Sequence, residues 1–181
     1  KGKEGRDDDA PAEGLRQLTG KQGRLVDSTY CNWGHPERLQ HPLNCVTAEQ
    51  AEAYCAFTGG RLPSSEEWEK AARGPDGLRF PWGDEPANCA RAAMHHGPPG
   101  CRADATWPVG KKPSDESVYG VFDMAGNVSE WVRDEEAPAG HQQVRGGGWA
   151  YADSSGMRPT RWHWAAVEHR SVHVGFRCVT P

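Results

Sequence analysis

The chain has 181 residues, a length typical of one domain. Only 36% of the residues are hydrophobic, and the 22 glycines and 14 prolines predict many turns and little long helix. This composition excludes a helical bundle, a coiled coil and a doubly wound fold, and no apolar stretch is long enough to insert into a membrane. The net charge of −4, without a Lys/Arg run, argues against a nucleic-acid partner.

The eight tryptophans and six cysteines indicate a thin core that large aromatic side chains and cross-links supplement. We therefore expect a loop-rich, extracytoplasmic domain, which is periplasmic, exposed at the cell surface or secreted. The chain starts at Lys1 without a signal peptide, which indicates a fragment or a processed form. Residues 1–24 hold no aromatic residue and are predicted to be a flexible arm or linker, with the globular domain over 25–181.

Two capping boxes predict two short helices. The box at 47–50 opens a helix over 48–58, and the box at 64–67 opens a helix over 66–73. Glycines follow both segments and are typical of helix ends. Helical spacing predicts the inward residues to be Ala51, Tyr54, Cys55 and Thr58 on the first helix, and Trp68, Ala71 and Ala72 on the second.

After residue 74 the chain is predicted to form short strands and loops. Five segments combine aromatic or β-branched residues with Gly, Pro or Asn turns: 80–89, 106–110, 120–132, 142–149 and 173–179. The predicted fold class is α+β, with two short helices and a small, irregular antiparallel sheet.

Several motifs occur in a specific order. AEAYCAFTGGRLPSSEEWEKAARG is followed by RFPWGDEPANC, YGVFDMAGNVSEWVRD, VRGGGW and VGFRCV. In this order they resemble the formylglycine-generating-enzyme family, also called sulfatase-modifying factors, over about 40–181. The resemblance implies a variant of the C-type-lectin fold. The family's N-terminal segment is not found, so the chain resembles the C-terminal part of the domain, and residues 1–30 or another chain are expected to complete the sheet.

The resemblance also implies a disulfide pairing. In the family, the cysteine of AYC bonds the cysteine of GFRC, which here are Cys55 and Cys178. Cys31–Cys45 and Cys89–Cys101 then remain as local pairs. An alternative stays open at the first pair, because Cys31, His35, His41 and Cys45 are all acceptable zinc ligands.

The segment 123–130 resembles a calcium loop of the family. The resemblance implies ligands from the side chains of Asp123 and Glu130 and from the carbonyls of Gly126 and Val128, around a structural Ca²⁺. A further calcium site of the family is not retained. Its carbonyl corresponds to that of Cys89, where a disulfide to Cys101 is expected to take over the role of the ion.

The family's oxidase binds copper through two cysteines that follow RGGSW. Those positions are Tyr151 and Gly156 here, and neither binds Cu(I), so no copper is expected. The preferred interpretation is a non-catalytic ligand-binding domain. The alternative is a metal-dependent oxidoreductase with an altered active site.

Residues 149–173 are rich in Trp, Tyr and His, which are typical of binding hot spots. The predicted surface for a protein or glycan ligand comprises Trp149, Tyr151, Asp153, Trp162, His163, Trp164, His169 and His173. Trp162 and Trp164 share a face if this segment is a strand, which leaves core and ligand roles open for them. The stretch also resembles the variable region of proteins diversified by retroelements, whose scrambled positions would be Tyr151, Asp153, Ser154, His163, His169, Ser171, Val172 and His173.

Overall fold

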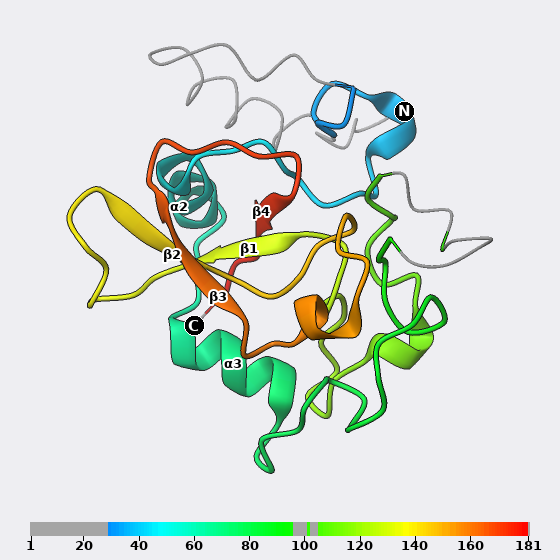
Figure 1. Cartoon of the computed structure of the whole chain (residues 1–181). Helices are drawn as coiled ribbons and strands as arrows, with labels where there is room; N and C mark the ends of the chain where they lie inside the picture. Colours follow the sequence, from blue (N-terminus) through cyan, green and yellow to red (C-terminus); the bar gives the residue numbers. More distant parts are fainter. Residues whose placement is uncertain (1–28, 96–100, 102–104, 181) are drawn as a thin grey trace, which may run out of the picture.

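The computed structural model describes residues 29–95, 101 and 105–180, so the predicted arm over 1–24 lies outside the described residues. The elements are η1 (Pro36–Arg38), α2 (Ala48–Phe57), α3 (Ser65–Arg73), η2 (Pro113–Asp115), β1 (Ser129–Val132), β2 (His141–Arg145), η3 (Ser154–Met157), β3 (Trp162–Ala166) and β4 (Val174–Phe176). Figure 1 shows a small sheet with α2 and α3 packed around it and long loops between the elements. The predicted α+β class with two short α-helices is confirmed.

Both capping boxes form. The Thr47 hydroxyl accepts a hydrogen bond from Gln50 N at 3.1 Å, while the Gln50 side chain accepts one from Thr47 N at 3.0 Å. The same reciprocal pair joins Ser64 and Glu67 at the start of α3. Because the caps satisfy free N–H groups, they fix where each helix begins. The structure starts α3 one residue before the predicted position and ends α2 at Phe57.

The sheet has the strand order β3-β2-β1-β4. β1 pairs antiparallel with β2, and β2 pairs antiparallel with β3, but β1 pairs in parallel with β4. The prediction of a purely antiparallel sheet was therefore wrong. β4 follows β3 in the chain but lies at the opposite edge of the sheet, beside β1 and in the same direction (Figure 1).

Two predicted strand segments form no strand. Within 80–89 only an isolated bridge joins Phe80 to Gly83. Within 106–110 the backbone N–H of Trp107 donates to the Asn127 side chain, and that of Gly110 donates to the Asp123 carboxylate. Side-chain oxygens thus accept the hydrogen bonds that a neighbouring strand would otherwise accept, so this segment forms no strand.

The two faces of β1 pack against different helices. Trp131 is fully buried with Ala51 and Cys55 of α2, whereas Val132 packs with Trp68 of α3. Neighbouring residues of a strand point to opposite faces, so the two helices cover opposite faces of the sheet. The residues of both helices that were predicted to point inward are buried or partly buried, except Thr58. Thr58 is exposed, and its hydroxyl donates to the Cys55 carbonyl.

One buried ion pair joins these layers. The Glu130 carboxylate on β1 accepts hydrogen bonds from Trp68 Nε1 of α3 at 2.6 Å, and from Arg177 Nε and Nη2, just after β4, at 2.6 and 2.7 Å. Arg177 also donates to the Phe122 carbonyl at 3.0 Å. Charged groups inside a protein are tolerated when such partners replace water, so Glu130 fixes the relative positions of helix, sheet and C-terminal strand.

The structure contains the disulfides Cys31–Cys45, Cys55–Cys178 and Cys89–Cys101, which confirms the expected pairing. The second ties α2 to the residues after β4 across a separation of 123 residues. Since Cys31 and Cys45 are bonded to each other, they are not free thiolates, and the zinc alternative is wrong for this structure. Of the two histidines in that alternative, His35 contacts Glu37 and His41 bonds to Thr106.

We expect the long-range disulfide to contribute more stability than a local one. The separations are 123 residues for Cys55–Cys178 and 12 for Cys89–Cys101, for which the chain-entropy model gives about 4–5 and about 3 kcal/mol. Urea unfolding of C55A/C178A and C89A/C101A measures both losses. An equal or larger loss in C89A/C101A would contradict this prediction.

Breaking the Glu130 ion pair should destabilise the fold strongly. The substitution Arg177→Met leaves a buried carboxylate without its cation, which typically costs about 3–5 kcal/mol. The matched control is Arg61→Met, because Arg61 pairs with Glu67 where both side chains are about half exposed, and such pairs contribute about 0–1 kcal/mol. Equal free energies of unfolding for the two variants would refute the structural role of Glu130.

Candidate functional site

The predicted calcium loop forms a compact turn beside the Glu130 ion pair. Asp123 and Asn127 both adopt left-handed backbone conformations, with φ of 59° and 66°. Gly126 packs closely, since a Cβ there would lie 3.0 Å from the Ala93 carbonyl oxygen. Asn127 fixes the turn further, because its side-chain amide donates to the Trp107 carbonyl at 3.0 Å. The loop therefore owes its shape to residues that tolerate an unusual backbone.

A second buried carboxyl, which the sequence analysis missed, supports this loop. Asp115 of η2 is 1% exposed, and its Oδ2 accepts the backbone N–H of Asp123 at 2.8 Å. Its Oδ1 has no hydrogen-bond partner among the described residues. Burial and the neighbouring Asp123 charge raise the pKa of Asp115 to about 8, and burial also raises the pKa of Asp123. No local pattern signals Asp115, because its role depends on a contact across a loop.

A cavity of about 340 Å³ opens beside the loop. Its lining includes three of the four expected calcium ligands, Asp123, Val128 and Glu130, but not Gly126. The carbonyl oxygens of Gly126 and Val128 accept no hydrogen bond from any described residue. Among the residues that the structure describes, no group of three or more His, Cys, Asp or Glu side chains is arranged to hold a metal. The four expected calcium ligands are not such a group of side chains, because they combine two carboxylates with two backbone carbonyls.

These oxygen donors fit a hard cation such as Ca²⁺. Asp115, Asp123 and Glu130 bring three buried carboxyls to this part of the core, where Arg177 is the cation that binds Glu130. Burial is the main cause of the raised pKa values of Asp115 and Asp123, and a divalent cation at this position would favour their ionised forms.

The two positions that correspond to the family's copper ligands lie against each other. A Cβ at Gly156 would be only 2.8 Å from Tyr151 Cδ1, so the tyrosine ring fills the space into which a side chain at 156 would extend. The Arg161 guanidinium lies over the same ring at 4.7 Å. All six cysteines of the chain are in disulfides. The chain therefore lacks the thiolate pair that would bind Cu(I) here.

At the family's other calcium site, the Cys89 carbonyl accepts a hydrogen bond from the Lys112 ammonium. The same ammonium lies 4.1 Å from the centre of the Trp107 ring, and burial lowers its pKa. A lysine side chain thus supplies positive charge at the carbonyl that the resemblance relates to a calcium ligand, next to the Cys89–Cys101 disulfide.

The predicted ligand surface separates into three contact groups. In the first, Trp149 is stacked on Tyr30 with ring centroids 5.7 Å apart and lies 4.9 Å from His173. Tyr30 is 44% exposed. His173 is partly buried, which lowers its pKa. Its Nδ1 has no hydrogen-bond partner in the described part of the chain. The sequence analysis missed Tyr30, which no motif signals.

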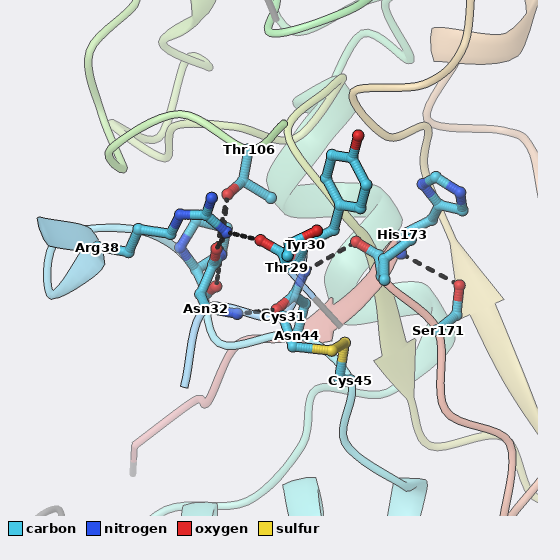
Figure 2. Close-up of a disulfide and its surroundings, with 12 residues drawn as sticks. Thr29, Tyr30, Cys31, Asn32, Arg38, Asn44, Cys45, Thr106, Ser171 and His173 are labelled. Carbon is cyan, nitrogen blue, oxygen red and sulfur yellow. Dashed lines mark hydrogen bonds between the residues drawn. A yellow bond between two sulfur atoms is a disulfide. The ribbon is translucent and has the colours of Figure 1, made fainter. Parts of the chain in front are cut away.

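A buried amide positions this first group. Asn44 donates to the carbonyls of Tyr30 and Val172 at 2.9 and 2.8 Å, so it ties two distant segments together. Figure 2 shows it beside the Cys31–Cys45 disulfide, with Tyr30 and His173 above. The disulfide therefore fixes the segment of Tyr30 to residues 44–45, and hydrogen bonds fix these residues to the C-terminal loop.

The second group comprises Trp162, His163 and Trp164 on β3, followed by His169. The two tryptophan rings make an edge-to-face contact at 5.2 Å, which confirms that they share one face of the strand. Trp162 is 48% exposed, while Trp164 is only partly exposed. His163 and His169 are also exposed. The third group comprises Tyr151 and Asp153, and the Asp153 carboxylate accepts the Gly156 N–H at 2.9 Å at the start of η3.

Residues 12–181 match the family model described as "Sulfatase-modifying factor enzyme 1-like domain". The inactive C-alpha-formylglycine-generating enzyme 2 of Mus musculus is 36% identical, over 81% of this chain and 51% of that protein. The hercynine oxygenase of Mycolicibacterium smegmatis is 31% identical, over 83% and 40%. The formylglycine-generating enzyme of Mycobacterium tuberculosis is 30% identical, over 81% and 62%. The chain spans less than two thirds of the length of each of these relatives.

Solved structures share the fold. PvdO from Pseudomonas aeruginosa superposes with a TM-score of 0.65 at 27% identity, over 76% of this chain and 60% of that one. Treponema denticola variable protein 1 superposes with a TM-score of 0.66 at 18% identity, over 90% and 78%, a likeness of fold alone. With the family model matching most of its length, the chain belongs to the formylglycine-generating-enzyme, or sulfatase-modifying-factor, family.

Proposed function

We propose that the chain is a non-catalytic binding domain, which uses the scaffold of the formylglycine-generating enzyme to present residues 149–173 to a protein or glycan ligand. One observation carries the proposal: Tyr151 and Gly156 stand where the copper thiolates would be, and the tyrosine ring fills the space between them. The mouse relative at 36% identity is itself named an inactive enzyme.

Exposed aromatic side chains support a binding role. Trp162 and Tyr30 are 48% and 44% exposed, and each rests on a second aromatic ring that holds it in place. Rigid, exposed Trp and Tyr provide a large contact area at a low entropic cost, which is why they dominate binding hot spots. The preformed aromatic surface around Trp162 and Tyr30 therefore supports a binding role.

The three disulfides favour an oxidising, extracytoplasmic compartment. None of the described helices is long and apolar enough to cross a membrane. The competing function for this chain is that of a metal-dependent oxidoreductase with an altered active site.

Calcium is the structural ion of the proposed domain. Asp123 and Glu130 would bind it through carboxylates, and Gly126 and Val128 through carbonyls. The ion would neutralise buried negative charge next to the Glu130 ion pair, which stabilises the loop rather than performing chemistry. Asp123, Glu130 and the Val128 carbonyl at the 340 Å³ cavity, together with the unbonded Gly126 carbonyl in the same loop, support this assignment.

The domain should neither bind Cu(I) nor oxidise a cysteine-containing peptide with oxygen. A titration of Cu(I) against a chromophoric chelator measures the first, and oxygen uptake with peptide mass measures the second. The double variant Y151C/G156C is the positive control, because it removes the obstructing ring and restores two thiols; it should gain Cu(I) binding. Oxygen-dependent turnover by the unmodified chain would overturn the proposal.

A binding role predicts that an exposed tryptophan is a hot spot. Ligands selected from a glycan array or a peptide display library should bind Trp162→Ala more weakly, by about 30-fold if the side chain contributes about 2 kcal/mol. Leu39→Ala is the matched control, because Leu39 is an exposed apolar residue far from 149–173 in the sequence, and its loss should leave affinity unchanged. Equal effects of both substitutions would place the ligand elsewhere.

Calcium should raise the melting temperature. A ligand at a hundred times its Kd stabilises the native state by about 2.7 kcal/mol, measurable by thermal unfolding in calcium against EGTA. Asp123→Ala should abolish the shift, whereas Asp84→Ala, which removes an exposed carboxylate, should retain it. An unchanged melting temperature of the unmodified chain would show that calcium is not bound.

A further inference from the structure

Among the described residues, β3 is an edge strand with no strand paired to its outer side. It pairs with β2 on one side only, and the sheet ends there. Gly146 N donates to the Arg161 carbonyl and Val167 N donates to the Gly140 carbonyl. Because bonded positions alternate in an antiparallel pair, the odd-numbered residues of β3 bond to β2, and Trp162, Trp164 and Ala166 point their N–H and C=O groups outward.

The outward groups at the tryptophans remain available. No described residue pairs with the backbone N–H or C=O of Trp162 or Trp164, whereas the Ala166 carbonyl accepts the His169 N–H at 2.9 Å. Soluble proteins usually protect such edges with lysine, proline or a bulge. The sequence of β3, WHWAA, has neither lysine nor proline, and its pairing with β2 is continuous. This edge therefore lacks the features that prevent another strand from pairing with it.

The surroundings of the edge are basic. Residues 158–173 contain three arginines and three histidines, with Glu168 as the single carboxylate. His163 as a whole is exposed, but its ring is partly buried. This burial lowers the pKa of His163, and the neighbouring Arg161 and His169 lower that pKa further. His163 is therefore neutral near pH 7, and the positive charge at the exposed edge comes from Arg161, in a chain whose net charge is −4.

We propose that the free edge of β3 binds an extended acidic segment of a partner protein, which adds to the sheet as a further strand. The inference rests on the proposed binding function and narrows its ligand to a peptide. Backbone groups of Trp162 and Trp164 would bond the segment, their rings would contact its side chains on one face, and Arg161 would attract its carboxylates.

The hydrogen-bonding pattern favours a peptide over a glycan. Outward N–H and C=O groups repeat at every second residue, which is the spacing that an extended backbone offers in return. The rings of Trp162 and Trp164 lie on one face, and Arg161 and His163 alternate with them along the chain, so an added strand would meet apolar surroundings in alternation with a cation and a polar ring. A segment that alternates apolar and acidic residues is the complement of such an edge.

Two short peptides test this, one alternating Val with Asp and the other alternating Val with Lys. Isothermal titration of the full chain should show binding of the Asp peptide and weaker binding of the Lys peptide, by about tenfold or more. Two methylated forms follow, one N-methylated at every Val and the other at every Asp. Only one edge of an added strand faces β3, so one methylated form should bind and the other should not.

Variants of the chain complete the test. Trp162→Ala should weaken binding of the Asp peptide by about tenfold or more, and Leu39→Ala should leave it unchanged. Arg161→Glu should reduce the preference for the Asp peptide over the Lys peptide, with circular dichroism confirming the fold. Equal affinity for both peptides, or equal binding of both methylated forms, would overturn the inference.

The outcomes also separate this inference from the proposed function. If glycans bind in a Trp162-dependent manner and neither peptide does, the inference fails while the binding function stands. Sedimentation could also show a dimer that the Trp162→Ala substitution dissociates. In that case a second copy of the chain occupies the edge, which overturns the inference of an acidic partner segment. If the chain oxidises thiol peptides, the binding function itself fails.

Discussion

The buried Glu130 carboxylate connects parts of the molecule that lie far apart in the sequence. Trp68 reaches it from α3, and Arg177 reaches it from beyond β4 while also bonding the Phe122 carbonyl. A buried ion is tolerated only when its partners are in place, so the helix, the sheet and the loop before β1 must assemble together. The Cys55–Cys178 disulfide lies one residue from Arg177 and fixes the same strand end covalently.

This arrangement would let the scaffold persist in the absence of the family's oxidative chemistry, as the proposed function requires. The copper positions, Tyr151 and Gly156, lie in the segment between β2 and β3 and take no part in the Glu130 network. Replacing two thiols by a ring and a glycine leaves that network intact, and the ring gains packing against Gly156 and Arg161. Function and fold therefore depend on different residues, as is common when one scaffold serves several roles.

Local signals predicted the local structure well. The capping residues Thr47 and Ser64 placed both helices to within one residue, and the alternation at 162–164 placed both tryptophans on one face. The strand predictions failed where side chains from distant residues took over the backbone hydrogen bonds, as Asn127 does for Trp107. Asp115, Tyr30 and the parallel register of β4 depend on contacts that no local pattern encodes.

The attachment of the N-terminal segment to residues 171–173 uses main-chain atoms of that loop. Asn44 donates to the Val172 carbonyl, Cys45 N donates to the Ser171 carbonyl, and Ser129 N donates to the His173 carbonyl. Such bonds are indifferent to which side chains the loop carries. A combinatorial library could therefore vary the side chains at these three positions while the loop keeps its main-chain hydrogen bonds. The domain is thus a suitable scaffold for selecting new binding specificities.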